Sequence, residues 1–315
     1  MVVLGNPTNV ADFASAVLKG SKQYFTKRTL HPGGSGLYAP ASYLTHPTLP
    51  DHTIYTPHPN ALRADERLPV LVWANGMSLA WGLMFSHFLR EIASHGYVVI
   101  ANGAPGENSG LLARLGRLHQ MPPEAMVEAV RWVMMAAGDA GAVEPGDVRA
   151  HVDVSRIALA GQSRGGLDAY AAAASLRSEK CIKTIGMFNS GLLFRSATTI
   201  AQVEGLREPV FYFLGGPADL AYKNAEQDWE LLPPELPAWC GNLMDVGHMG
   251  TFYEEGGKEE DEMMGGGGGG KFGRAALDWL DAVLKGDEEA KRRMVEEYER
   301  EGWKVKSRNL ESVLL

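Results

Sequence analysis

Short apolar runs alternate with amphipathic stretches along most of this chain. The runs have five or six residues each and are mostly uninterrupted by charge, which is the pattern of strands buried on both faces of a sheet. Glycines bound most of them. The runs that we interpret as strands are His52–Thr56, Val70–Ala74, Tyr97–Ala101, Arg156–Ala160, Thr184–Asn189, Val210–Leu214 and Asn242–Val246.

Helical periodicity fills the intervals between these runs. Strands and helices that alternate along a chain form right-handed βαβ units. The pattern therefore predicts an α/β fold with a mostly parallel central sheet and helices on both faces. No internal repeat or break in composition divides residues 51–315, so we expect one domain there. The predicted helices cover about 79–95, 123–138, 165–177, 221–231 and 272–285.

Residues 1–50 follow a different pattern. An amphipathic stretch, Val10–Lys19, leads into the glycine-rich segment His31–Gly36 and then into a proline-rich approach to the first strand. We expect an N-terminal helix and a segment that wraps the domain. A second departure is the glycine-rich segment 256–270, which ends in the unbroken tract Gly265–Gly270 and is predicted to be a loop.

The composition is that of a globular protein. The chain has 315 residues, of which 45% are hydrophobic, and a net charge of -8, so it is long and apolar enough for a full core. No run approaches the ~18 apolar residues of a membrane span, and no basic cluster indicates a nucleic-acid partner. The N-terminus lacks the features of a signal peptide. This favours a cytoplasmic protein, with a secreted protein whose leader has been removed as the alternative.

The fourth apolar run ends in a motif that carries chemistry. Gly161-Gln162-Ser163-Arg164-Gly165 reads G-x-S-x-G between a predicted strand and an alanine-rich helix, which is the context of a nucleophile elbow. The turn is sharp, so its flanking positions must lack a Cβ atom, and the helix N-terminus favours developing negative charge. We predict Ser163 as a catalytic nucleophile. The alternative is a tight turn with an inert serine.

A serine hydroxyl needs a base, and the base needs an orienting acid. Of the nine histidines, His248 alone follows Ser163, as the order serine, acid, histidine requires. Between them, Asp219 stands a short turn beyond the strand Val210–Leu214, at the end of the sheet where functional groups gather. Asp245 is expected inside a strand with its side chain directed away. We predict Asp219 as the acid, with a helix N-cap as the alternative role.

The tetrahedral intermediate of such a reaction needs two backbone donors. One is expected from the amide of Arg164, the residue after the nucleophile. The other is expected from the loop that follows the strand Val70–Ala74. We predict the amide of Met77, with Gly76 permitting close approach.

With these pieces in place, the chain resembles the α/β-hydrolases of the group that holds cutinase-like and polyester hydrolases, chlorophyllases and the platelet-activating-factor acetylhydrolase type. The resemblance implies the α/β-hydrolase fold, no cofactor, and cleavage of carboxylic esters. The chain departs from many lipases because its oxyanion loop lacks their HGGG motif, and neither residues 1–50 nor the glycine tract carries any part of the resemblance. The segments that carry it are Leu68–Gly76, Ile92–Ile100, Ala160–Gly166, Leu214–Asp219 and Val246–His248.

In this fold the strand Val210–Leu214 separates the two strands at whose entrances Cys181 and Cys240 are expected. Two strand spacings amount to ~10 Å, which is beyond disulfide reach. We therefore expect free thiols. The cysteines also lack the spacing of a zinc site, and no metal is predicted.

A cap built from loops after the strands is expected to roof the substrate pocket. These loops span about 103–122, 190–207 and 249–270 and are rich in apolar side chains. We predict Trp81, Phe194 and Met249 as substrate-binding residues. Such a lining favours an apolar or aromatic ester, either a small molecule or a polymer.

The sequence leaves two other functions open. The same triad serves acyltransferases and cyclising or C–C-cleaving enzymes of secondary metabolism, in which something other than water takes the acyl group. A non-catalytic binding protein on a hydrolase scaffold is disfavoured, because a retired site has no physical need for all three of Ser163, Asp219 and His248. A nicotinamide cofactor is disfavoured because no G-x-G-x-x-G follows the first strands.

Overall fold

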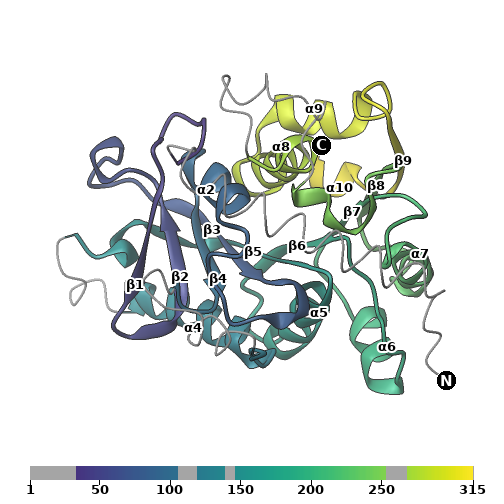
Figure 1. Cartoon of the computed structure of the whole chain (residues 1–315), viewed down its shortest axis with the longest axis horizontal. Coiled ribbons are helices and arrows are strands. Elements are labelled where there is room, and N and C mark those ends of the chain that lie inside the picture. Colours follow the sequence, from purple (N-terminus) through teal and green to yellow (C-terminus); the bar gives the residue numbers. More distant parts are fainter. Residues whose placement is uncertain (1–32, 106–118, 139–145, 253–267, 315) are drawn as a thin grey trace.

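A single twisted sheet runs through the described part of the molecule (Figure 1). The computed structural model describes residues 33–105, 119–138, 146–252 and 268–314. The predicted N-terminal helix at 10–19 and most of the glycine-rich loop 256–270 lie outside these residues. Within them, the sheet has nine strands in the order β1-β2-β4-β3-β5-β6-β7-β8-β9.

The centre of the sheet is parallel and its edges are antiparallel. Strands β3 to β8 pair in parallel, whereas β1, β2 and β9 are antiparallel to their neighbours. The mostly parallel α/β sheet is thereby confirmed. The strands are β1 (Ser42–His46), β2 (Leu49–Thr56), β3 (Leu68–Ala74), β4 (Val98–Asn102), β5 (Val152–Gln162), β6 (Ile182–Phe188), β7 (Val210–Leu214), β8 (Ala238–Leu243) and β9 (Trp303–Arg308).

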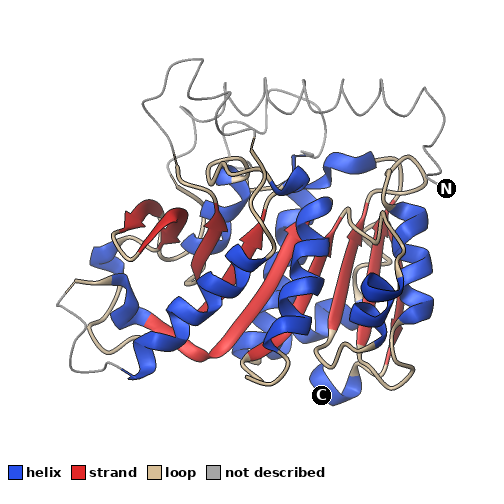
Figure 2. Cartoon of the chain, turned by 90° about the horizontal axis from the view of Figure 1, so that it is seen from below, coloured by secondary structure: helices blue, strands red, loops and turns tan. Residues whose placement is uncertain are grey.

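Helices cover both faces of the sheet (Figure 2). They are α2 (Ser86–Ser94), α4 (Glu124–Gly138), α5 (Arg164–Leu176), α6 (Ala197–Glu204), α7 (Tyr222–Leu231), α8 (Gly270–Leu280), α9 (Glu288–Glu296) and α10 (Glu311–Leu314). Short 3-10 turns lie at Pro59–Ala61, Gly76–Ser78, Val148–His151 and Gly247–Phe252, and a π turn at Asp281–Lys285 follows α8. No helix of the described residues is long and apolar enough to cross a membrane.

Alternate residues of the central strands point to opposite faces of the sheet and pack into two separate hydrophobic cores. On one face, Val70 and Val72 of β3 pack with side chains of α4, α5, α6 and α7. On the other face, Leu71 and Trp73 pack with α2, α8 and α9. Because both faces are covered, the central strands are apolar over most of their length, which explains why the sequence shows them as apolar runs.

Several predicted elements differ from the structure. The last strand was expected at 242–246, but β8 is Ala238–Leu243, and Asp245 lies beyond it in a turn at φ 66°. The helix expected over 79–95 begins only at Ser86. Helix α6 lies in the segment 190–207 that was expected to be a loop, and strands β1 and β9 were not predicted.

Both cysteines are buried free thiols, as expected. Cys181 directly precedes β6, but Cys240 lies inside β8 rather than at the entrance of a strand. Burial raises the pKa of the Cys240 thiol to about 12.

Candidate active site

Ser163 occupies a strained turn between β5 and α5. Its φ of 54° and ψ of -121° are rare for a residue with a side chain. Three hydrogen bonds hold it there: its N–H donates to the Phe188 carbonyl (3.0 Å), and its own carbonyl accepts from the Gly166 N–H (3.1 Å) and the Ser190 hydroxyl (2.5 Å). The turn therefore has the strand-to-helix form expected of a nucleophile elbow.

The glycines of the motif are required by space. A Cβ atom on Gly161 would lie 2.3 Å from the backbone of Gly165, and one on Gly165 would lie 2.1 Å from the Ala74 carbonyl oxygen. Both neighbours are backbone atoms of the elbow and of β3, which cannot move aside without displacing the turn. Glycine at these positions lets α5 begin directly against the sheet.

Ser163, His248 and Asp219 form one hydrogen-bonded chain. The Nε2 atom of His248 lies 2.9 Å from the Ser163 Oγ, and its Nδ1 atom lies 2.7 Å from Oδ1 of Asp219. The imidazole and the carboxylate are both buried. With the proton of a neutral imidazole on Nδ1, where it is donated to Asp219, Nε2 is left to accept the serine proton.

The Asp219 carboxylate is surrounded by donors. Besides His248, Oδ1 accepts from the Ala221 N–H (2.9 Å), and Oδ2 accepts from Asn189 Nδ2 (2.7 Å) and the Gly215 N–H (3.2 Å). Asp219 is not the N-cap of α7, which was its alternative role: that position is Ala221, and no side chain caps the helix. Asp245 is exposed and outside the strand in which it was expected.

Two buried amide side chains fix the loop that carries His248. Gln162 donates to the His248 carbonyl (2.9 Å). Asn189 donates to the Gly247 carbonyl (3.0 Å) and accepts from the Gly250 N–H (3.2 Å). Sequence reasoning missed both residues. Gln162 occupies a variable position of the G-x-S-x-G motif, and Asn189 was assigned to the end of a strand although it adopts φ 45° beyond β6.

The predicted oxyanion loop has an unusual backbone. Met77 and Ser78 both have positive φ angles, of 56° and 53°. Asn75 braces the loop, since its Nδ2 atom lies 2.9 Å from the carbonyl oxygens of both Leu79 and Asn102. Met77 and Arg164 line the same cavity as Ser163, so the structure brings together the residues predicted to form the oxyanion hole.

A second link ties this loop to α5. The Ser78 hydroxyl donates to Oδ2 of Asp168 (2.5 Å) and accepts from Nε of Arg164 (3.1 Å). Burial raises the pKa of Asp168 to about 6. The pair joins the loop after β3 to the helix that begins at the elbow.

Ser163 and His248 open onto a cavity of about 250 Å³. Four large apolar side chains with substantial exposure lie around it: Met77 (47%), Leu193 (61%), Phe194 (53%) and Leu220 (40%). Of the predicted substrate-binding residues, Phe194 lines the cavity. Trp81 and Met249 do not line it: Trp81 packs against the core on the α2 face, and Met249 follows His248 in the turn Gly247–Phe252.

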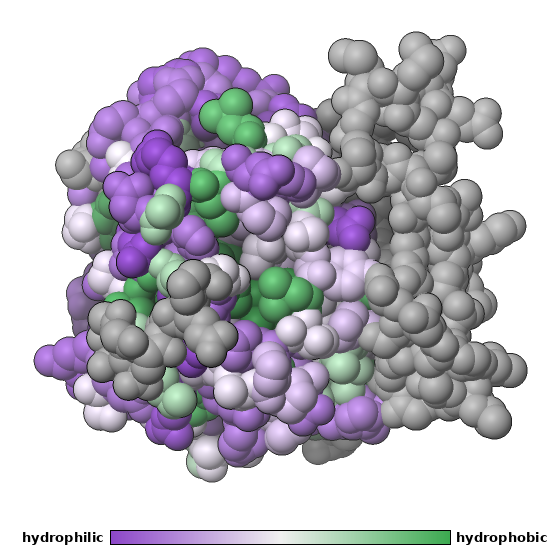
Figure 3. All heavy atoms as spheres, turned by 90° about the vertical axis from the view of Figure 1, so that its left-hand side faces the viewer, coloured by the Kyte–Doolittle hydropathy of each residue, from purple (hydrophilic) through white to green (hydrophobic). Residues whose placement is uncertain are grey.

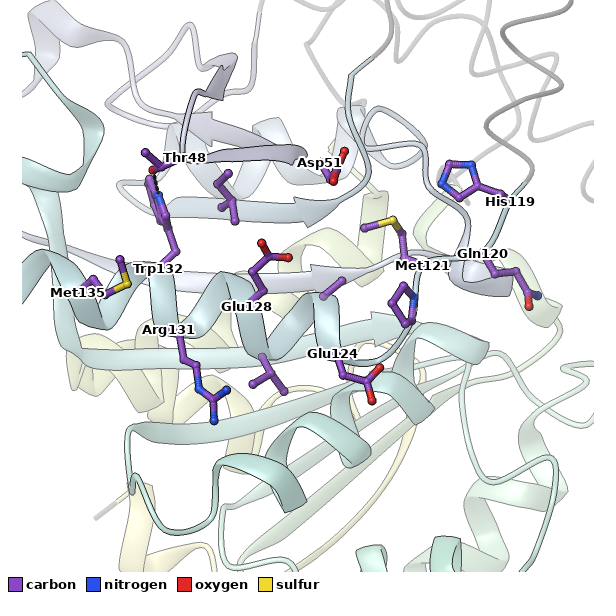
Figure 4. A pocket seen from close by; sticks show the side chains of 14 residues that line it. Thr48, Asp51, His119, Gln120, Met121, Glu124, Glu128, Arg131, Trp132 and Met135 are labelled. Carbon is purple, nitrogen blue, oxygen red and sulfur yellow. Dashed lines mark hydrogen bonds between the residues drawn. The ribbon is translucent and has the colours of Figure 1, made fainter.

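A larger groove of about 730 Å³ lies between β2 and α4 (Figure 4). The carboxylates of Asp51, Glu124 and Glu128 lie along it, and among the described residues Gln120 lines both this groove and the first cavity. The face at the β1 end of the molecule is mostly hydrophilic where it is drawn in colour, with small separate apolar patches (Figure 3). Among the described residues, no group of histidine, cysteine, aspartate and glutamate side chains is suited to hold a metal ion.

The sheet order, the elbow after β5 and the helices on both faces define an α/β-hydrolase, and the chain belongs to this superfamily. More particularly, residues 51–205 match the model of the chlorophyllase family. By this match the protein is an enzyme that hydrolyses carboxylic esters. No curated protein matches the chain. The family match contains Met77, Ser163 and Arg164 and ends before Asp219 and His248, so the acid and the base rest on the geometry alone.

Proposed function

We propose that this protein is a serine hydrolase that cleaves an apolar or aromatic carboxylic ester through an acyl-enzyme at Ser163. The observation that carries the proposal is the chain from Asp219 through His248 to Ser163, which ends at an apolar cavity. A buried acid, an imidazole and a serine in this order supply a nucleophile, a base and an orienting group.

In the first half of the reaction, Ser163 Oγ attacks the ester carbonyl carbon while its proton passes to His248 Nε2. The carbonyl oxygen becomes an oxyanion, for which the amides of Met77 and Arg164 are the donors. His248 then gives the proton to the leaving alcohol oxygen as the C–O bond breaks. Asp219 keeps the imidazole in the required tautomer and stabilises its charged form.

In the second half, water takes the place of the alcohol. His248 accepts a proton from the water, whose oxygen attacks the acyl carbon, and returns that proton to Ser163 Oγ as the acid leaves. The net reaction is ester plus water to acid plus alcohol, and it needs no cofactor.

The cavity supports the apolar part of the proposal. Exposed Leu193, Phe194 and Leu220 lie around the reacting serine, and burying a methylene group of a ligand against such side chains contributes about 0.8 kcal/mol. The name chlorophyllase points to chlorophyll as a substrate of the matched family, and an ester with a large apolar group agrees with this lining.

The proposal is tested with p-nitrophenyl esters from acetate to dodecanoate. We expect the protein to hydrolyse them and Ser163→Ala to lose at least ~10³-fold in kcat. Ser175→Ala is the matched control, because Ser175 is an exposed residue near the far end of α5, about three turns beyond Ser163. Hydrolysis by Ser163→Ala at the rate of the unmodified protein, or no hydrolysis of any ester by the unmodified protein, would contradict the proposal.

A further inference from the structure

The loop between β6 and α6 forms one wall of the cavity. Ser190 is its second residue, and the Ser190 hydroxyl donates to the carbonyl of Ser163 itself. Leu193 and Phe194 follow, and both line the cavity although more than half of each side chain is exposed. Exposed apolar side chains have little packing of their own to fix their position. Their placement therefore depends on what holds the loop on either side of them.

One buried carboxylate holds both sides. Oδ2 of Asp228 in α7 accepts from the Leu192 N–H (2.7 Å), and Oδ1 accepts from Nη1 of Arg195 (2.8 Å). Leu192 and Arg195 are the residues directly before and after the pair that lines the cavity. The Asp228 side chain has no exposed surface, whereas that of Arg195 keeps 27%.

Burial of this carboxylate is energetically unfavourable. It raises the pKa of Asp228 to about 6 despite the Arg195 guanidinium and the Leu192 amide. A buried charge is weak evidence for stability, and holding a specific conformation is one role that explains it. Here the conformation held is that of a turn on the wall of the cavity.

We propose that Asp228 is a positioning residue that holds Leu193 and Phe194 against the substrate and thereby sets selectivity for the length of its apolar chain. The inference rests on the proposed function, since it concerns the same cavity. Asp228 acts through Leu192 and Arg195 and does not itself line the cavity. Two further contacts fix parts of the loop: Gly191 lies against Ala225 of α7, and the Thr199 hydroxyl donates to the Phe194 carbonyl (2.8 Å).

The test compares Asp228→Asn with the unmodified protein on p-nitrophenyl acetate and octanoate at pH 8, where Asp228 is ionised. Asparagine keeps the shape of the side chain but offers one acceptor in place of two. We expect kcat/KM for octanoate to fall about 10-fold, mainly through KM, which is the scale of contact with one or two methylene groups. The acetyl group is too short to reach the wall, so kcat/KM for acetate is expected to change no more than about threefold.

Asp278→Asn is the matched control. Asp278 is also buried and also accepts from an arginine, Arg293, but it lies on α8 away from the cavity. It is expected to lower the melting temperature without changing the ratio of octanoate to acetate rates. Adding Phe194→Ala to Asp228→Asn is expected to lower octanoate kcat/KM by less than the product of the two single effects, since both remove the same contact.

An unchanged octanoate-to-acetate ratio in a folded Asp228→Asn variant would overturn the inference, and so would an equal loss on both esters. Neither result would affect the proposed function, which depends on the hydrolysis of at least one of the esters and on its loss in Ser163→Ala. If Asp228→Asn does not fold, Arg195→Gln provides the same comparison, because it removes one of the two ties from the exposed side.

Discussion

Replacing Asp219 with asparagine fills the same space but changes which ring nitrogen of His248 carries the proton. The carboxylate accepts four hydrogen bonds, two at each oxygen. An asparagine presents one oxygen and one NH₂ group, so the NH₂ group must face two former donors. At the Oδ2 position these are Asn189 and Gly215. The Gly215 N–H cannot accept, and Asn189 can present its oxygen only by giving up its bonds to the Gly247 carbonyl and the Gly250 N–H.

At the Oδ1 position the NH₂ group faces the Ala221 N–H and Nδ1 of His248. The imidazole can adapt, because it can carry its proton on Nε2 and accept at Nδ1. We therefore expect Asp219→Asn to adopt this arrangement. The Nε2–H group then points at the Ser163 hydroxyl and cannot take its proton. The expected loss is ~10⁴-fold in kcat, or about 5 kcal/mol in the activation free energy.

Folding is expected to suffer less. The buried Ala221 N–H loses its acceptor, which costs about 1–2 kcal/mol. The assay is the kcat for p-nitrophenyl butyrate at pH 8, with urea unfolding of the same samples. Asp245→Asn is the control, since Asp245 is exposed and asparagine tolerates its positive φ. A kcat for Asp219→Asn within tenfold of the unmodified protein, or a comparable loss in Asp245→Asn, would refute the reasoning.

Two further predictions concern stability. Gly165→Ala places a Cβ atom 2.1 Å from the Ala74 carbonyl oxygen and is expected to lower the free energy of unfolding by about 1–3 kcal/mol; an unchanged urea midpoint would contradict this. For Asp168, burial raises the folded-state pKa from 3.8 to about 6. The folded chain therefore holds this proton more tightly than the unfolded chain, and the stability contributed by Asp168 is full below about pH 4 and lost as the pH rises through about 6. Over that pH range the free energy of unfolding of the unmodified protein is expected to fall by roughly 3 kcal/mol more than that of Asp168→Asn. If the two free energies of unfolding change in parallel with pH, the pKa of Asp168 is not raised.

The parts of this molecule visible in the sequence are those set by local rules. The central strands can be recognised because burial on both faces makes them apolar over most of their length. Ser163 can be recognised because its turn requires glycines at fixed spacing. His248 can be recognised because no other histidine follows Ser163. Asp219 was selected by its place after β7, and the structure indeed sets it against His248.

The parts that were missed depend on partners distant in the sequence. Strand β8 contains Gly241 and Asn242, which weaken a strand pattern, and its place is set by pairing with β7 and β9. Strand β9 alternates lysine with other residues because it is an edge, so it lacks the apolar run of a central strand. The prediction of Trp81 as a substrate contact is not supported by the cavity lining, because sequence alone does not show whether an aromatic residue near an oxyanion loop faces the cavity or the core.

Buried polar side chains that hold loops in place are the residues hardest to predict from sequence. Asn189 and Gln162 hold the histidine loop, and Asp228 holds the cavity wall, each through bonds to residues 30 or more positions away. Nothing in the local sequence of a buried amide or carboxylate indicates which distant backbone group it will meet. Such residues follow from the fold, and the fold must be known before they can be found.

The claim that Ser163 is the nucleophile is tested most directly by a fluorophosphonate probe, with the site of attachment read by peptide mass spectrometry. We expect one adduct per chain, located on Ser163, with normal labelling of Ser175→Ala and none of Ser163→Ala. An intact, folded protein that takes up no probe, or an adduct on any other residue, would contradict the account.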